Sequence, residues 1–377
     1  MIVFSEGGSK AGGITNAILF MIAKDNMPFN IVKREGFKYF MKTIVPLYSV
    51  PGRKSITKYM EEKYNYLSLV AKNRLNTVQH VSLISDLWTN VLNTVSYLEI
   101  TAHYEFEDEL RSTTIDVTEV TERHTAEVLG RWMKNIMDDW NDKDKVVVMV
   151  TDNGPNIVKA EFTYTLEFNK HLPCFAHTLN LVATHTMDFY DATVLVTKIK
   201  TIVTFFKQSS IAASELRKVS ALKLIQCIDT RWNSIYYMLE RFILLADTDV
   251  SILLKISSLP SMLTAAELLL AKEIPEVLRP VEQVTKELCG EKYVTISIMI
   301  PMIYCLKRKI ESLRTRLQTP TAQTLIDRLQ FQITKRFESI TANRIIAVST
   351  ILDPRFKRLH FQQNELVACA AISQLHC

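Results

Sequence analysis

The stretch Lys145-Val146-Val147-Val148-Met149-Val150-Thr151-Asp152-Asn153-Gly154-Pro155 decides the predicted fold. Its first half is a continuous β-branched run, which is typical of a central strand that is buried on both faces. The Asn-Gly-Pro sequence that follows favours a turn, and proline is tolerated as the first residue of a helix. We therefore predict a buried strand that ends at a polar turn, with Asp152 just past its carboxyl end.

Before this strand, the apolar residues recur with a period of two. Residues 97–106 alternate between apolar and polar side chains, as a half-buried strand does, and residues 81–85 and 111–120 are predicted to be its neighbours. An apolar stripe on residues 128–140 predicts a helix before the central strand. If this crossover is right-handed, strand 81–85 lies beside and parallel to the central strand. The sequence thus predicts an α/β fold built on a mixed sheet.

Two aspartates lie at the carboxyl ends of these two strands, since Asp86 follows residues 81–85 and Asp152 follows the central strand. Adjacent strands are about 4.8 Å apart, so both carboxylates could share one ligand. Paired carboxylates repel each other unless a proton or a hard cation lies between them, which favours Mg²⁺ or Mn²⁺. The alternative is structural: a strand-end cap at Asp86 and an Asx turn at Asp152.

Residues 1–76 are predicted to form a helical module with basic edges, and Thr57 is expected near the start of its third helix. The candidate DNA-binding residues of this module are Lys33, Arg34, Arg53 and Lys54. Basic clusters of this kind are usually solvated surfaces, and contact with DNA phosphates is the alternative. The whole chain carries a formal net charge of only +5, which permits a nucleic-acid partner without requiring one.

The part of the chain after Cys174 is predicted to be mostly helical. Arg231 next to Trp232 could pair with a phosphate and stack on an unpaired base, or Trp232 could simply be the first core residue of its helix. Cys174 and His177 have the spacing of half a zinc site, but no second pair stands at a convincing distance, so zinc is not expected. The structural alternative is a strand-to-helix turn.

Composition excludes several classes of protein. Only 9 glycines and 11 prolines occur among 377 residues, and 47% of the residues are hydrophobic, which argues against disorder and for a compact, largely helical chain. The six cysteines show no repeated spacing, which favours a reducing, intracellular compartment. No apolar run approaches the roughly 20 residues needed to span a bilayer, so no membrane partner is expected.

Several motifs, taken in order, carry a family resemblance. They are Ser85-Asp86-Leu87-Trp88-Thr89-Asn90, Val150-Thr151-Asp152-Asn153-Gly154-Pro155-Asn156, Cys174-Phe175-Ala176-His177-Thr178-Leu179-Asn180, Thr230-Arg231-Trp232-Asn233-Ser234 and Leu352-Asp353-Pro354-Arg355-Phe356-Lys357. Together they resemble the hAT superfamily of DNA transposases and its domesticated descendants, the BED-type zinc finger proteins. The resemblance covers nearly the whole chain.

This resemblance implies a ribonuclease H-like mixed sheet with a large all-helical insertion and an amino-terminal helical module. The expected domains are a DNA-associated module at 1–76, the first part of the ribonuclease H-like domain at 77–228, the insertion at 229–345, and the start of the returning, truncated region at 346–377. Asp86 and Asp152 would be the first two acids of a DDE triad and would bind a divalent cation. The family also uses the tryptophan that Trp232 matches near flanking DNA, and the Cys174–His177 motif beside the active site.

Two parts of the family pattern do not appear in the sequence. There is no BED finger, and the family's third acid, in a Ser-Glu-Arg-x-Phe-Ser segment, does not occur before Cys377. Glu282, Glu287 and Glu365 lack that context. We therefore expect a transposase-derived nuclear DNA-binding protein that neither cleaves nor joins DNA alone, with any homodimer formed through regions only partly present. The alternatives are a fragment of an active cut-and-paste transposase and a protein-interaction scaffold.

Overall fold

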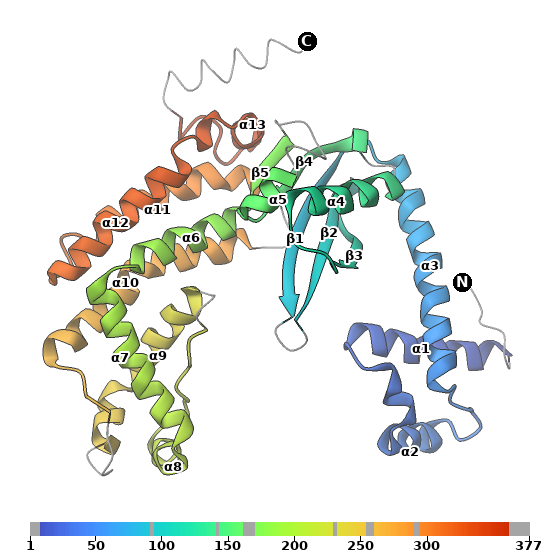
Figure 1. Cartoon of the computed structure of the whole chain (residues 1–377), viewed down its shortest axis with the longest axis horizontal. Coiled ribbons are helices and arrows are strands. Elements are labelled where there is room, and N and C mark those ends of the chain that lie inside the picture. The colour runs from blue at the N-terminus through green and yellow to red at the C-terminus, as the bar shows by residue number, and fades with distance from the viewer. Residues whose placement is uncertain are drawn as a thin grey trace. The chain divides into compact units, whose positions relative to one another are not determined.

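A computed structural model describes seven ranges of the chain: 8–90, 94–140, 143–160, 170–228, 232–253, 260–289 and 294–361. The chain divides into two compact units, whose helices and strands are labelled in Figure 1. Unit 1 comprises residues 1–149 with 164–166, and unit 2 comprises residues 150–163 with 167–377. The predicted domain boundaries at residues 76, 228 and 345 remain predictions. In the described ranges, no helix is long and apolar enough to cross a membrane.

Unit 1 begins with the expected helical module. Its elements are α1 (Gly8–Lys24), the short 3-10 helix η1 (Phe29–Lys33), α2 (Glu35–Ile44) and α3 (Arg53–Thr77). One cluster of buried side chains holds them together: Ile18, Leu19, Ile22, Val32, Met41 and Ile56. The expected start of the third helix near Thr57 is wrong, because Gly52 is already the N-cap and α3 begins at Arg53. Arg53 and Lys54 therefore lie in the first helical turn.

The far end of α3 is fastened to the rest of unit 1 by three hydrogen bonds from lysine side chains. The Lys145 Nζ donates to the carbonyl oxygens of Leu75 (2.7 Å) and Asn76 (3.1 Å) in the last turn of the helix, where the Leu75 carbonyl also accepts from the Val78 backbone N–H. The Lys72 Nζ donates to Asp139 Oδ2 at 2.7 Å. The basic module is thus joined to the sheet through a helix that is anchored at its carboxyl end.

The sheet has five strands in the order β3-β2-β1-β4-β5, and it confirms the predicted mixed sheet with the 81–85 strand beside the central one. The strands are β1 (Val81–Asn90), β2 (Val95–Phe106), β3 (Glu109–Glu119), β4 (Val146–Thr151) and β5 (His171–Pro173). β1 pairs antiparallel with β2, and β2 with β3. Along β2 every second residue from Ser96 to Tyr104 is buried, as the alternation predicted.

Two details of the sheet correct the sequence analysis. β1 does not end before Asp86 but continues to Asn90, because Leu87 to Asn90 pair with Val95 to Leu98 of β2. The central strand β4 is not buried on both faces either, since the Val147 side chain is 41% exposed. Asp86 therefore lies in the middle of a strand, and only Asp152 directly follows one.

The remaining helix of unit 1 is α4 (Ala126–Trp140), which is followed by the 3-10 helix η2 (Lys143–Lys145). Its buried side chains include Leu129, Met133 and Met137, so the predicted apolar stripe is confirmed. The turn between β2 and β3 is formed by Glu107 and Asp108. Both have φ near +60°, as the central residues of a type I′ hairpin turn require.

Unit 2 is almost entirely helical after β5. Its helices are α5 (Pro155–Ala160), α6 (Phe175–Met187), α7 (Tyr190–Gln208), α8 (Ser210–Val219), α9 (Trp232–Leu253), α10 (Ala265–Leu288), α11 (Met299–Glu311), α12 (Pro320–Phe337) and α13 (Arg344–Leu352), with 3-10 helices η5 (Ile296–Ile298) and η6 (Ile340–Ala342). Pro155 is the first residue of α5, which confirms its expected place at a helix start.

The helix that carries Cys174 and His177 at its start, α6, is held by α12. The Phe175 and Phe337 rings pack with their centroids 4.7 Å apart. Arg328 of α12 donates hydrogen bonds to three carbonyl oxygens at the end of α6: those of His185 (2.8 Å), Thr186 (3.0 Å) and Asp188 (2.8 Å). One guanidinium thus satisfies carbonyls that the helix itself leaves unpaired.

We predict that Arg328→Met lowers the free energy of unfolding by about 2–3 kcal/mol, because three carbonyls lose a charged donor. Chemical denaturation followed by circular dichroism measures the change. The control is Arg316→Met: the Arg316 side chain is 63% exposed and lies 3.7 Å from Glu276, so its loss is expected to cost less than about 0.5 kcal/mol. Equal effects of the two substitutions would contradict the proposed role of Arg328.

Candidate functional site

Asp86, the first predicted acid, is exposed and lies directly opposite Glu99 in the β1–β2 pair. Residues opposite each other in antiparallel strands project from the same face, with Cβ atoms about 5 Å apart. Two carboxylates on one open face repel each other unless a cation or solvent screens them. Glu99 was not singled out from the sequence, although the alternation of residues 97–106 already placed it on the polar face.

The same face of β1 and β2 carries an aromatic pair next to the two acids. Trp88 lies opposite Tyr97, with ring centroids 4.8 Å apart and planes tilted by 31°. Trp88 is 40% exposed although tryptophan is usually well covered. Within unit 1, Asp86 therefore lies on an exposed, partly aromatic face of β1 and β2.

Asp152, the second predicted acid, lies in the turn between β4 and α5 and is half-buried. Its Oδ1 accepts a hydrogen bond from the Gly154 backbone N–H at 2.9 Å, which closes an Asx turn. The structural alternative for Asp152 is therefore realised. It is compatible with ion binding, because Oδ1 is engaged by one donor and a carboxylate has further lone pairs.

Hydrogen bonds tie this turn to the start of α6. The Asn153 Nδ2 donates to Thr178 Oγ1 at 3.0 Å, and Thr178 Oγ1 donates to the Cys174 carbonyl oxygen at 2.9 Å. The Cys174 backbone N–H donates to the Thr151 carbonyl oxygen at 2.7 Å. The motif around Asp152 and the motif around Cys174 are thus parts of one hydrogen-bonded assembly within unit 2.

A half-buried histidine completes the support of the Asp152 turn. The Thr151 hydroxyl donates to the Asp152 carbonyl oxygen (2.9 Å) and lies 3.0 Å from His171 Nε2. Because that hydroxyl has a single proton, His171 donates through a protonated Nε2. Burial lowers the pKa of His171, so the ring is neutral at pH 7. His171 was not identified from the sequence, since β5, which carries it, has only three residues.

Cys174 is the N-cap of α6, and His177 lies in its first turn, so the predicted strand-to-helix turn is confirmed. Both side chains are half-buried. In the part of the chain that the structure describes, no three His, Cys, Asp or Glu side chains form a group that could hold a metal ion. Carboxylate oxygens suit Mg²⁺ or Mn²⁺, but water would have to supply much of the coordination.

Asp86 belongs to unit 1 and Asp152 to unit 2, so their convergence on one cation stays a prediction. Of the candidate third acids, Glu282 is 4% exposed and accepts hydrogen bonds from the Tyr237 hydroxyl and the Lys286 ammonium group. Those partners give it a structural role in the helical region. Glu365 lies outside the described residues.

The predicted DNA-binding residues fall into two groups. Lys33, Arg34, Arg53 and Lys54 are all exposed on the helical module of unit 1, and none forms an ion pair with another described residue. Trp232 is only 5% exposed at the start of α9, which favours its interpretation as a core residue. Its contact with DNA stays a prediction, and Arg231 lies outside the described residues.

We predict that Gly154→Ala destabilises the Asp152 turn. An added Cβ would lie 2.9 Å from Asp152 Oδ1, so the carboxylate must move and its hydrogen bond to Gly154 is weakened. The expected loss is about 1–2 kcal/mol of unfolding free energy, measured by chemical denaturation. Gly36→Ala is the control, because nothing lies within 4 Å of that position, and it should be neutral or slightly stabilising. A neutral Gly154→Ala would show that the turn does not depend on this contact.

Comparison with known proteins is consistent with this arrangement. Residues 84–175 match the family model of the ZBED1 RNase-like domain, and residues 172–274 match that of the ZBED1 RNase-like helical domain. The chain is 25% identical to zinc finger BED domain-containing protein 4 of Homo sapiens over 96% of its length and 32% of that protein. It is 27% identical to the putative AC transposase of Zea mays over 88% of its length and 43% of that protein.

A third relative is the transposable element Hobo transposase of Drosophila melanogaster, which is 25% identical over 75% of the chain and 44% of that protein. The matches thus span 32% to 44% of the length of these three relatives. The RNase-like match covers most of the five-stranded sheet, and the helical-domain match covers α6 to the first part of α10. This chain is a homologue of the hAT transposases and the BED-type zinc finger proteins, with their ribonuclease H-like fold.

Proposed function

We propose that this chain is a transposase-derived, nuclear DNA-binding protein that contacts DNA through the basic helical module of unit 1. The carrying observation is the charge of that module: between residues 8 and 60 there are nine Lys or Arg and only two Asp or Glu. The net charge of the whole chain is only +5, so positive charge is concentrated at this end. A concentrated basic surface attracts DNA phosphates without reading sequence.

The two aspartates of the sheet region have a role in this proposal that is separate from DNA binding by the basic module. In this proposal Asp86 and Asp152 bind one Mg²⁺ or Mn²⁺ weakly, and the chain alone does not cleave DNA. Support comes from the adjacent positions of β1 and β4 in the sheet and from the fixed Asx turn that holds Asp152. A hard cation beside a phosphate would orient the attacking and leaving oxygens, which needs more ligands than two aspartates supply.

The alternative is that the chain is part of an active cut-and-paste transposase, which the names of two of its relatives favour. A nicking assay with Mn²⁺ on hairpin and flanked duplex ends separates the two proposals. Nicking by this chain that disappears in Asp152→Asn would favour the active transposase.

The first prediction of the proposed function concerns binding to DNA. Replacing Lys33, Arg34, Arg53 and Lys54 together by glutamine should weaken binding to random duplexes at low salt. It should also lower the slope of log K against log salt by about 0.9 for each DNA phosphate that the variant no longer neutralises. Fluorescence anisotropy over a series of salt concentrations gives both quantities.

The matched control for the DNA prediction is the replacement of Lys307, Arg308, Lys309 and Arg316, which removes the same charge from unit 2. Affinity and slope should then stay close to those of the parent. If both quadruple variants behave like the parent, the helical module is not the surface that binds DNA.

The second prediction concerns the cation. The Asp86→Asn, Asp152→Asn double variant should bind Mn²⁺ at least about tenfold more weakly than the parent in titration calorimetry, because carboxylates are the preferred ligands. The control pair is Asp138→Asn, Asp144→Asn, two exposed aspartates of unit 1. A separate Glu99→Gln variant reports whether the acid opposite Asp86 contributes. Unchanged Mn²⁺ affinity in the first double variant would end the shared-site proposal.

A further inference from the structure

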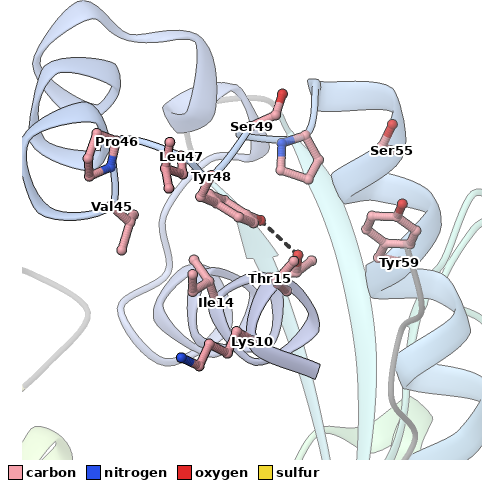
Figure 2. Close-up of a pocket in the computed structure, with 12 residues that line it drawn as sticks. Lys10, Ile14, Thr15, Val45, Pro46, Leu47, Tyr48, Ser49, Ser55 and Tyr59 are labelled. Atoms are coloured by element: carbon pink, nitrogen blue, oxygen red, sulfur yellow. Dashed lines mark hydrogen bonds between the residues drawn. The ribbon is translucent and has the colours of Figure 1, made fainter. Parts of the chain in front are cut away.

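A cavity of about 730 Å³ lies in the helical module of unit 1, and neither the resemblance nor the relatives assign it a role. It is lined by α1, by the loop between α2 and α3, and by the start of α3 (Figure 2). Its volume is within the range of about 300–1,000 Å³ that is typical of pockets for small ligands. The polar side chains that line it are Lys10, Thr15, Tyr48, Ser49, Ser55 and Tyr59.

The Tyr48 ring is held in a fixed position in this cavity. Thr15 is buried and donates its single hydroxyl proton to the Ala11 carbonyl oxygen at 3.0 Å. The Tyr48 hydroxyl, 2.7 Å from Thr15 Oγ1, must therefore be the donor in that contact. Figure 2 shows the ring reaching from the loop to α1, with Ser55 and Tyr59 on the neighbouring helix. Burial raises the pKa of Tyr48, so the phenol stays protonated and the contact is kept.

The lining combines flat rings with hydroxyl groups and one ammonium group. Tyr48, Tyr59, Pro46 and Pro51 offer ring surfaces against which a planar heterocycle can pack. Hydroxyls both donate and accept hydrogen bonds, which suits the mixed donors and acceptors of a base edge or a sugar. A purely apolar ligand would desolvate the Lys10 ammonium group and the Ser49 and Ser55 hydroxyls without offering them a hydrogen-bond partner.

The charge around the cavity selects for an anion. Lys10 is the charged residue of the lining, and the exposed Arg53 and Lys54 lie in the sequence between the lining residues Pro51 and Ser55. From residue 8 to the end of α3 at Thr77 the module has twelve Lys or Arg and four Asp or Glu. A ligand with a planar body and a phosphate matches both the rings and the charge.

We propose that this cavity binds one unpaired nucleotide, with the base against the Tyr48 and Tyr59 side and the phosphate toward Lys10. The inference deepens the proposed DNA-binding function and rests on it for the source of the nucleotide. A paired base cannot enter, because its edge is occupied and its faces are stacked; an extruded or terminal base can. A free nucleotide has the same chemistry, and the experiment separates the two sources.

The test uses the full chain and three probes that contain 2-aminopurine: a fully paired duplex, the same duplex with one unpaired 2-aminopurine nucleotide, and the free deoxynucleoside monophosphate. Ser55→Met fills the cavity from α3, and Lys10→Gln removes the ammonium group while leaving the helices unchanged. The controls are Ser68→Met and Lys63→Gln, which make the same two kinds of substitution in α3 at residues that do not line the cavity. Thermal unfolding by circular dichroism verifies that each variant is folded. If Ser55→Met does not fold, Lys10→Gln still tests the proposal.

The parent should bind the duplex with the unpaired nucleotide about tenfold more tightly than the paired one. Ser55→Met and Lys10→Gln should both abolish that preference, while both controls retain it. The affinity for the paired duplex should change by less than about twofold in Ser55→Met, and in Lys10→Gln it should fall no further than in the charge-matched control Lys63→Gln. A parent without the preference, or a preference that survives both pocket variants, overturns the strand-nucleotide proposal. If no duplex binds but the free nucleotide does, and Ser55→Met abolishes this, the proposed DNA-binding function fails while the cavity remains a nucleotide site.

Discussion

A single backbone hydrogen bond, from the Cys174 N–H to the Thr151 carbonyl oxygen at 2.7 Å, joins the end of the central strand to the start of α6. The turn that carries Asp152 lies directly after Thr151, and its Asn153 is bonded to Thr178 in the first turns of α6. Arg328 holds the other end of the same helix. The position of the second acid therefore depends on contacts with α6 and, through Arg328, on α12, which comes much later in the chain.

The two chemically distinct regions of unit 1 carry opposite charge. The helical module is strongly basic, whereas the open face of β1 and β2 presents Asp86 opposite Glu99. An acidic face repels a DNA backbone unless a cation neutralises it, and a basic module attracts the same backbone. In the proposed function the module thus supplies affinity, and the carboxylates depend on a divalent cation to approach a phosphate at all.

In the two proposals, the helical module contains both the basic residues that give affinity for DNA and the cavity that selects an unpaired base. Phosphate contacts from exposed lysines and arginines position DNA without selecting among its forms. In our proposal the cavity, in which a hydrogen bond holds the Tyr48 ring, selects instead for a base that is not paired. The hydrogen bond between Tyr48 and Thr15 fixes one of those rings before any ligand arrives, which reduces the entropy lost on binding.

The sequence alone predicted the α/β class, the order of three strands, a helix and a central strand over residues 81–151, and the helix start at Pro155, because hydrophobic period and proline geometry are local properties. With a right-handed crossover it also predicted the adjacency of the first and central strands. The sequence-based prediction was wrong or incomplete where the pairing between strands sets the structure. β1 extends past Asp86 because β2 offers it partners, and Glu99 becomes the neighbour of Asp86 only through the register. His171 and the cavity around Tyr48 were likewise invisible, since each depends on contacts between segments distant in sequence, which only tertiary structure creates.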